Sequence, residues 1–278
     1  MPSLGRLAQG RGVAHYAPAM EALPLGTSRA TVTRLPGGAL EGDRLAVEEP
    51  LEIRVDGRAV AVTMRTPGHD EELALGFCLT EGLHPVGAHP PPDLAANVVE
   101  VEAPDADLAA VQRSFYTSSS CGVCGKGALE AVAVDAPRIE SDLAVPFEVL
   151  AALPIALAEA QAAFALTGGL HATGLFSPDG TLLCVREDVG RHNAMDKVVG
   201  WAFGERLLPL SRSVLCVSGR LSFELVQKAA VAGCPVLVAV GAPSSLAVEL
   251  ADDRGLTICG FVRDGSATAY THPHRVVP

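Results

Sequence analysis

The chain has 278 residues, 49% of them hydrophobic and 19% charged, so it can bury a substantial core and is not a disordered chain. Its formal net charge of -11 argues against a general nucleic-acid binder or a polybasic membrane binder, while remaining compatible with a local basic pocket for a phosphorylated ligand. No apolar run reaches the ~18 residues that span a bilayer, and the first residues lack the pattern of a secretory signal. We therefore expect a cytoplasmic protein with neither a membrane nor a nucleic-acid partner.

The N-terminal part of the chain predicts a small α+β domain behind a flexible tail. Residues 1–28 show no sustained periodicity and form the predicted tail. Residues 29–117 form the predicted domain, with a hairpin turn at Val55-Asp56-Gly57-Arg58 and a proline-rich loop at 84–93. The predicted strands cover 30–34, 44–47, 51–55, 58–64 and 98–101, and the predicted helix covers 70–81, with acidic residues in its first turn.

The rest of the chain, residues 118–278, alternates helices with strands and predicts an α/β domain that carries a cysteine pair. The predicted helices cover 125–134, 147–164, 192–203, 221–232 and 244–253. The predicted strands cover 170–176, 182–187, 214–217, 236–240, 257–261 and 267–270. This alternation indicates a mostly parallel sheet covered on both faces, and a hairpin around 177–180 adds an antiparallel edge.

Seven cysteines occur in the chain, and five of them stand singly in apolar surroundings, as small buried hydrophobes do. Cys121 and Cys124 instead form a close pair within a segment rich in serine and glycine. A helix is predicted to begin just after the pair, and its N-terminal dipole together with Lys126 favours a thiolate over a thiol. The pair is therefore the best candidate for cysteine chemistry.

Four interpretations of this pair compete on the residues alone. A zinc site needs about four ligands, and no second cysteine pair or nearby histidine pair supplies them. A thioredoxin-like redox pair follows a strand, whereas this pair follows a polar linker. Sulfur carriage, in which one cysteine holds a persulfide and the other helps to release it, is the third interpretation. Two buried structural cysteines, the fourth, fit poorly with the serine and glycine neighbours.

Candidate binding loops follow several strands of the predicted sheet, and they should face one edge of it. The charged block 186–197 is either part of a ligand site or a cluster in which Asp188 or Asn193 caps a helix. Ser218-Gly219-Arg220 suits an oxyanion or phosphate, or is a capped turn. Gly241–Ser245 is a third junction, and Gly260–Gly265 is either a nucleotide cradle or a hairpin turn.

The chain resembles the formate dehydrogenase accessory sulfurtransferase family, of the FdhD type, from about Ala30 to the C-terminus. The most specific match is Glu187-Asp188-Val189-Gly190-Arg191-His192-Asn193-Ala194 with Asp196 and Lys197. The other matching segments are Thr66-Pro67-Gly68, Gly76-Phe77 with Glu81-Gly82, Ser120–Gly125, Gly168–His171, Ser218-Gly219-Arg220 with Glu224, Gly241–Ala247 and Gly260–Arg263. His69 stands where the resemblance predicts an acid.

The resemblance implies a three-layer fold like the cytidine deaminase core, with the smaller α+β domain on its N-terminal side. In zinc deaminases, two core helices open with H-x-E and P-C-x-x-C. Here the corresponding helices open at His192-Asn193-Ala194 and at Ser218–Ser222, so the glutamate and both cysteine ligands are missing. We therefore expect no metal bound by the protein itself.

The function implied by the resemblance is sulfur transfer from a cysteine desulfurase to a molybdenum bis-(molybdopterin guanine dinucleotide) cofactor that formate dehydrogenase needs. The persulfide falls on Cys121, with Cys124 as an attacking or assisting thiol. The cofactor-binding residues are Ser218, Gly219, Arg220, His192 and the stretch Gly260, Phe261, Val262, Arg263, Asp264 and Gly265. The family also suggests a homodimer. The alternatives are a cofactor chaperone that handles no sulfur and a zinc-dependent, deaminase-like hydrolase.

Overall fold

The computed structural model describes residues 24–93, 95–106, 134 and 136–278. Cys121, Cys124 and most of the predicted helix 125–134 therefore lie outside the described residues. The larger part of the molecule contains a six-stranded sheet in the order β13-β12-β11-β10-β8-β9. These strands are β8 (His171–Phe176), β9 (Leu182–Asp188), β10 (Val214–Val217), β11 (Val236–Ala239), β12 (Thr257–Arg263) and β13 (Ser266–Ala269).

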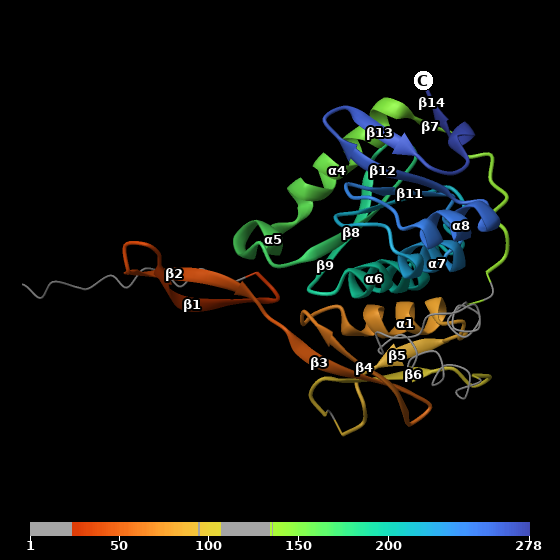
Figure 1. Ribbon diagram of the computed structural model, residues 1–278. Coiled ribbons are helices and arrows are strands. Elements are labelled where there is room, and N and C mark those ends of the chain that lie inside the picture. Colours follow the sequence, from red (N-terminus) through yellow and green to blue (C-terminus); the bar gives the residue numbers. More distant parts are fainter. Residues whose placement is uncertain (1–23, 94, 107–133, 135) are drawn as a thin grey trace, which may run out of the picture.

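Helices cover both faces of this sheet (Figure 1). On one face, α4 (Phe147–Ala160) buries three leucines against residues that alternate along the strands. On the other face lie α6 (Arg191–Gly204), α7 (Phe223–Val231) and α8 (Ser245–Arg254). Because apolar side chains point to both sides of β10, β11 and β12, two separate hydrophobic cores form. The large part is thus a three-layer α/β/α arrangement.

The prediction of a mostly parallel sheet is correct only for the central strands. β10 pairs with β11 and β11 with β12 in parallel, while β8, β9 and β13 are attached by antiparallel pairing. The hairpin predicted around 177–180 does join β8 to β9. Periodicity indicates that a strand is buried but carries no information about its direction, so the antiparallel pairings of β8 with β10 and of β13 with β12 escaped prediction.

The smaller part contains a four-stranded sheet in the order β4-β3-β6-β5, with α1 (Asp70–Thr80) packed on it. The strands are β3 (Glu49–Val55), β4 (Arg58–Arg65), β5 (Gly87–His89) and β6 (Val98–Glu102). Asp56 and Gly57 both have positive φ and form the predicted hairpin turn between β3 and β4. β5 lies within the segment predicted as a loop, because its antiparallel pairing with β6 overrides the local proline signal.

A separate hairpin, β1 (Thr27–Arg34) and β2 (Ala39–Ala46), extends away from both sheets (Figure 1). The predicted strands at 30–34 and 44–47 were too short, because pairing along the whole hairpin continues both of them. β1 also begins inside the segment predicted as tail. Two further short strands, β7 (Val145–Pro146) and β14 (Val276–Val277), pair in parallel beside the short helix η1 (Pro273–Arg275).

The predicted helix 147–164 is two helices, because the chain breaks at Gln161. The second helix, α5 (Ala162–Thr167), begins where the Glu187 carboxylate of β9 accepts hydrogen bonds from the backbone N–H groups of Ala163 (2.9 Å) and Phe164 (2.7 Å). A carboxylate at a helix N-terminus satisfies otherwise unpaired N–H groups and the helix dipole. α7 likewise begins two residues later than predicted, at Phe223, because Ser222 is its N-cap.

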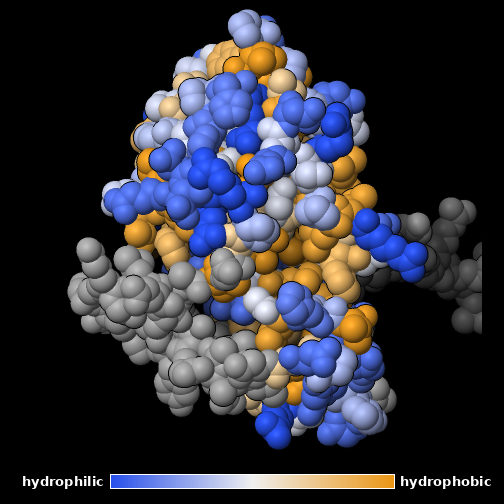
Figure 2. All heavy atoms as spheres, turned by 90° about the vertical axis from the view of Figure 1, so that its right-hand side faces the viewer, coloured by the Kyte–Doolittle hydropathy of each residue, from blue (hydrophilic) through white to orange (hydrophobic). Residues whose placement is uncertain are grey.

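The two parts meet where α1 packs against α6. Across the molecule, the layers are therefore stacked in the order smaller sheet, α1, the helix layer that contains α6, and larger sheet (Figure 1). On the face shown in Figure 2, apolar residues gather at the height where the two parts meet. Among the described residues, no helix has the length and apolar character needed to cross a membrane.

Candidate functional site

The predicted binding loops converge at one edge of the large sheet, as the chain order suggested. The backbone N–H of Gly241, which follows β11, donates to the carbonyl of Gly219, which follows β10, at 3.2 Å. The N–H of Phe261 in β12 in turn donates to the carbonyl of Gly241 at 3.1 Å. Leu221 and Ala242 add a further backbone hydrogen bond of 3.1 Å between the first two loops. Backbone bonds thus join all three segments into one surface.

Two glycines make this close approach possible. A Cβ at Gly241 would lie 2.9 Å from the carbonyl oxygen of Gly219, and a Cβ at Gly260 would lie 2.9 Å from that of Gly241. Such contacts are shorter than real Cβ atoms accept, so any larger residue at either position would push the loops apart. The glycines of the motifs therefore serve loop packing here.

The segment Gly260–Gly265 is mainly a bulged β-hairpin rather than an open loop. β12 continues to Arg263, beyond the predicted end at Phe261, and Asp264 and Gly265 form the turn with positive φ. Val262 is fully buried, whereas Phe261 and Arg263 are exposed. The Arg263 guanidinium carbon lies 5.9 Å from the centre of the Phe261 ring. An arginine and an aromatic face are thus presented together at the edge.

His192 at the start of α6 faces the start of α7. Its Nε2 lies 3.3 Å from the Ser222 hydroxyl oxygen and 3.6 Å from a carboxylate oxygen of Glu224. The hydrogen bond with His192 is the main reason that the pKa of Glu224 falls to about 2, although burial opposes the shift. The imidazole thus connects the β9–α6 junction, through its contacts with Ser222 and Glu224, to the loop that carries Arg220.

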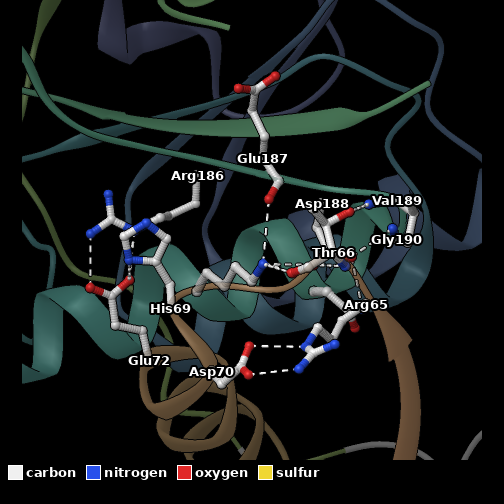
Figure 3. A network of polar contacts seen from close by, with 12 residues as sticks. Arg65, Thr66, His69, Asp70, Glu72, Arg186, Glu187, Asp188, Val189 and Gly190 are labelled. Carbon is white, nitrogen blue, oxygen red and sulfur yellow. Dashed lines mark hydrogen bonds and ion pairs between the residues drawn. The ribbon is translucent and has the colours of Figure 1, made fainter. Parts of the chain in front are cut away.

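Asp188 at the end of β9 holds this junction against the smaller part (Figure 3). Its Oδ1 accepts from the Gly190 N–H at 2.8 Å and from the Asn193 amide at 3.0 Å. Its Oδ2 accepts from the Thr66 N–H at 3.1 Å and lies 2.8 Å from the Lys197 ammonium. The capping interpretation is wrong in detail, because the N-cap is Gly190 and no side chain caps α6. The cluster is a buried contact between the two parts of the molecule.

A cavity of about 460 Å³ opens beside these loops, between α4, α5 and the start of β8. Ser218, which begins the β10 loop, lines it together with His171, and a Cβ at Gly219 would lie 3.6 Å from the Nδ1 of His171. Gln161 and Phe164 also line it, and sequence reasoning assigned neither of them a role. The only available signal was their position near the Gly168–His171 motif.

The described cysteines are unsuited to thiolate chemistry. All five are buried and free: Cys78, Cys184, Cys216, Cys234 and Cys259. Burial raises the pKa of Cys78, Cys184, Cys234 and Cys259 to about 12, and that of Cys216 further. No cluster of histidine, cysteine or acidic residues suited to a metal ion occurs in the part of the chain that the structure describes.

Comparison with known proteins shows which family the chain is related to. The model of the FdhD/NarQ family matches residues 46–277, which is most of the chain. The chain belongs to the FdhD/NarQ family. It is 51% identical over 271 residues to the "Sulfur carrier protein FdhD" of Mycolicibacterium paratuberculosis, covering 90% of this chain and 98% of that protein.

More distant relatives also match over most of the chain. The protein of the same name from Sulfolobus acidocaldarius is 43% identical over 84% of this chain and 91% of its own. A crystal structure from Desulfotalea psychrophila, provisionally described as a formate dehydrogenase accessory protein, superposes with a TM-score of 0.71 at 26% identity. It covers 91% of this chain and all of that chain. The match therefore includes both the smaller and the larger part.

Proposed function

We propose that this protein is a sulfur carrier and transferase that accepts sulfur on Cys121 and delivers it to a molybdenum bis-(molybdopterin guanine dinucleotide) cofactor for formate dehydrogenase. Membership of the FdhD/NarQ family, with relatives named sulfur carriers, supports the sulfur-handling role. The observation that carries the assignment to the pair is that every described cysteine is buried with a raised pKa, which leaves Cys121 and Cys124 as the thiols available for exchange.

The first step is a thiol exchange with a cysteine desulfurase. The Cys121 thiolate attacks the outer sulfur of the desulfurase persulfide, the S–S bond of the donor breaks, and the donor cysteine leaves as a thiolate. Cys121 then carries the persulfide. We place this exchange in the cytoplasm, where thiols stay reduced between turnovers.

The second step releases the terminal sulfur to the metal of the cofactor substrate. The Cys124 thiolate attacks the inner sulfur of the Cys121 persulfide, a Cys121–Cys124 disulfide forms, and the outer sulfur leaves as hydrosulfide. Two electrons pass from the two cysteines to that sulfur, so the disulfide must be reduced by a cellular dithiol before the next cycle.

The edge of the large sheet is the proposed docking surface for the nucleotide part of this substrate. Arg220, Arg263 and His192 supply cationic or hydrogen-bonding groups there, and backbone N–H groups start α7 beside them. Local donors of this kind are needed because the net charge of -11 gives no general attraction for a phosphate. The three-layer arrangement also supports our proposal of a cytidine-deaminase-like core without its zinc ligands. We further propose a homodimer as the working unit.

The test measures formate dehydrogenase activity in cells that lack the chromosomal gene for this protein and express either the wild type or a variant from a plasmid. The Cys121→Ala variant should leave the dehydrogenase inactive, and Cys184→Ala, which removes a buried thiol on β9, should restore it as the wild type does. Full activation by Cys121→Ala would favour a cofactor chaperone that handles no sulfur. Both variants should be checked for equal amounts of folded protein.

A further inference from the structure

The helix pair α4–α5 exposes an apolar surface on the outside of the molecule. The helices cover one face of the large sheet, where α4 buries its leucines. The side chains that this packing leaves uncovered include Ile155, Phe164 and Leu166, which are 64%, 41% and 43% exposed. The only charged residues of the two helices are Glu148 and Glu159, and neither has an ion pair within the described residues. A helix that is apolar on its outer side is usually covered by another element.

The β1–β2 hairpin, which extends away from both sheets, has two different faces (Figure 1). On one face, Arg34 forms ion pairs with Glu41 at 3.2 Å and with Asp43 at 3.1 Å. On the other face, Arg29 lies directly across from Arg44 in the strand register. The charges of the first face are therefore neutralised within the hairpin, whereas the second face carries two neighbouring cations.

These two cations have no acidic partner in the part of the chain that the structure describes. No ion pair joins Arg29 or Arg44 to a carboxylate there, and the Nη1 of Arg44 is buried without a hydrogen-bond acceptor. Like charges directly across a strand pair destabilise it, and a buried donor without an acceptor costs about 1–3 kcal/mol. The second face of the hairpin therefore requires acceptors from outside its own chain.

The same face meets its own α5 only at the base of the hairpin. Side chains two positions apart share a face of a strand, so Ala46, Arg44 and Leu40 follow one another along this face of β2. Ala46 lies near the end of α5, where a Cβ at Gly169 would be 3.6 Å from its own. Further out, Leu40 is 75% exposed. A two-stranded hairpin is only marginally stable in water by itself, so its uncovered outer half needs a packing partner.

We propose that the outer half of the hairpin lies on the α4–α5 surface of a second copy of this chain, and that the exchange is mutual. The hairpin supplies an apolar side chain, Leu40, and two cations without an acid, whereas the α4–α5 surface supplies apolar side chains and two carboxylates without a cation. Both halves of a complementary contact are thus present on one chain, and a two-fold axis satisfies both contacts at once. The inference rests on the homodimer of the proposed function and gives that homodimer an interface.

Sedimentation equilibrium of the full chain tests this interface. The wild type should have twice the chain mass of 28.7 kDa. Leu40→Asp on the hairpin and Leu166→Asp on α5 should each weaken the dimer at least about tenfold, because each dimer contains the altered contact twice. Leu45→Asp, on the opposite face of β2 at a position 48% exposed, is the matched control and should remain dimeric. Circular dichroism checks that every variant is folded.

Cross-linking tests the exchange without disrupting the contact. Two differently tagged chains are co-expressed with Cys121→Ala and Cys124→Ala, one also carrying Leu40→Cys and the other Leu166→Cys. The five remaining native cysteines are buried. A short bismaleimide should join the two different tags, because β2 of one copy lies on α5 of the other. Leu45→Cys in place of Leu40→Cys should give much less of this product.

A monomeric wild type would overturn the inference, as would a dimer that both aspartate variants leave unchanged and that gives no mixed cross-link. Persulfide formation on Cys121 of the wild type separates this failure from that of the proposed sulfur transfer. Sulfur uptake by a monomeric wild type would show that the interface alone is wrong. A dimer with the mixed cross-link but without sulfur uptake would support the interface and contradict sulfur carriage by Cys121.

Discussion

Gly76 of α1 and Gly200 of α6 face each other's helix backbone across the contact between the two parts of the molecule. A Cβ at Gly76 would lie 1.8 Å from the carbonyl oxygen of Asp196, and a Cβ at Gly200 would lie 1.8 Å from that of Glu72. The two helices therefore approach as closely as backbones can, and this contact fixes how the smaller part sits on the α6 layer that carries His192.

Gly200→Ala should destabilise the fold through this contact. The added methyl group has no room against a backbone carbonyl, so the helices must separate, at a cost of about 1–3 kcal/mol or more in the free energy of unfolding. Gly204→Ala, at the end of the same helix with nothing within 4 Å, should change stability little. Urea unfolding followed by circular dichroism compares them, and equal stability of the two variants would contradict the close contact.

Lys197→Met should be strongly destabilising, because it leaves the Asp188 carboxylate buried without its cation. Both side chains are at most 1% exposed. Removing one partner of a buried pair costs about 3–5 kcal/mol, whereas an exposed pair contributes little. Arg212→Met, which removes the exposed pair with Asp142, is the matched control. A loss of similar size in both variants would show that the Asp188 pair is not buried in solution.

The contact between Glu72 and Arg186 should make stability depend on acid pH. Burial raises the pKa of Glu72, but hydrogen bonds from Arg186 and His69 outweigh it and lower the pKa to about 2, from an ordinary value of 4.5. The folded-state pKa lies below the unfolded one, so the carboxylate stabilises the fold fully above about pH 4.5, and this contribution is lost as the pH falls toward 2. The stability difference between wild type and Glu72→Gln should therefore shrink between these pH values.

Thermal unfolding of both proteins across that pH range measures the difference. Glu41→Gln, at an exposed ion pair on the β1–β2 hairpin, should show little change at any pH. A difference between wild type and Glu72→Gln that stays constant from pH 6 to about pH 2 would contradict the assignment.

Arg263→Ala should weaken the binding of GDP about ten- to a hundredfold, because a charged hydrogen-bonding partner contributes roughly 1.5–3 kcal/mol. Persulfide formation on Cys121 should be unchanged. Arg212→Ala removes an arginine before β10, at the opposite end of that strand, and should bind GDP as the wild type does. Equal GDP affinity in wild type and Arg263→Ala, measured by calorimetry, would show that the hairpin is not part of the docking surface.

The sequence predicted the central α/β order well, because β10, β11 and β12 are short apolar runs separated by helices with serine N-caps at Ser222 and Ser244. Such signals depend only on neighbouring residues, so they can be recognised in a single sequence without knowledge of the packed structure. The break at Gln161 escaped prediction, because the carboxylate that starts α5 comes from Glu187, more than 20 residues further along the chain.

The candidate site was predictable in its position but not in its chemistry. Strands that end at one edge bring Gly219, Gly241 and Gly260 together, and chain order alone indicated this. The role of Asp188 depends on Thr66, which lies 122 residues away, and no spacing rule connects them. The cavity at Gln161 depends on how α4 and α5 lie over β8, which only the packed structure defines.

The most direct test of the central claim is mass spectrometry of the protein after incubation with a cysteine desulfurase and cysteine. Wild type should gain about 32 Da, one sulfur atom, on the peptide that contains Cys121, and treatment with a dithiol should remove it. Cys121→Ala should gain nothing, whereas Cys184→Ala should gain the same mass as wild type. No adduct on the wild type, or an adduct of equal amount on Cys121→Ala, would contradict sulfur carriage by Cys121.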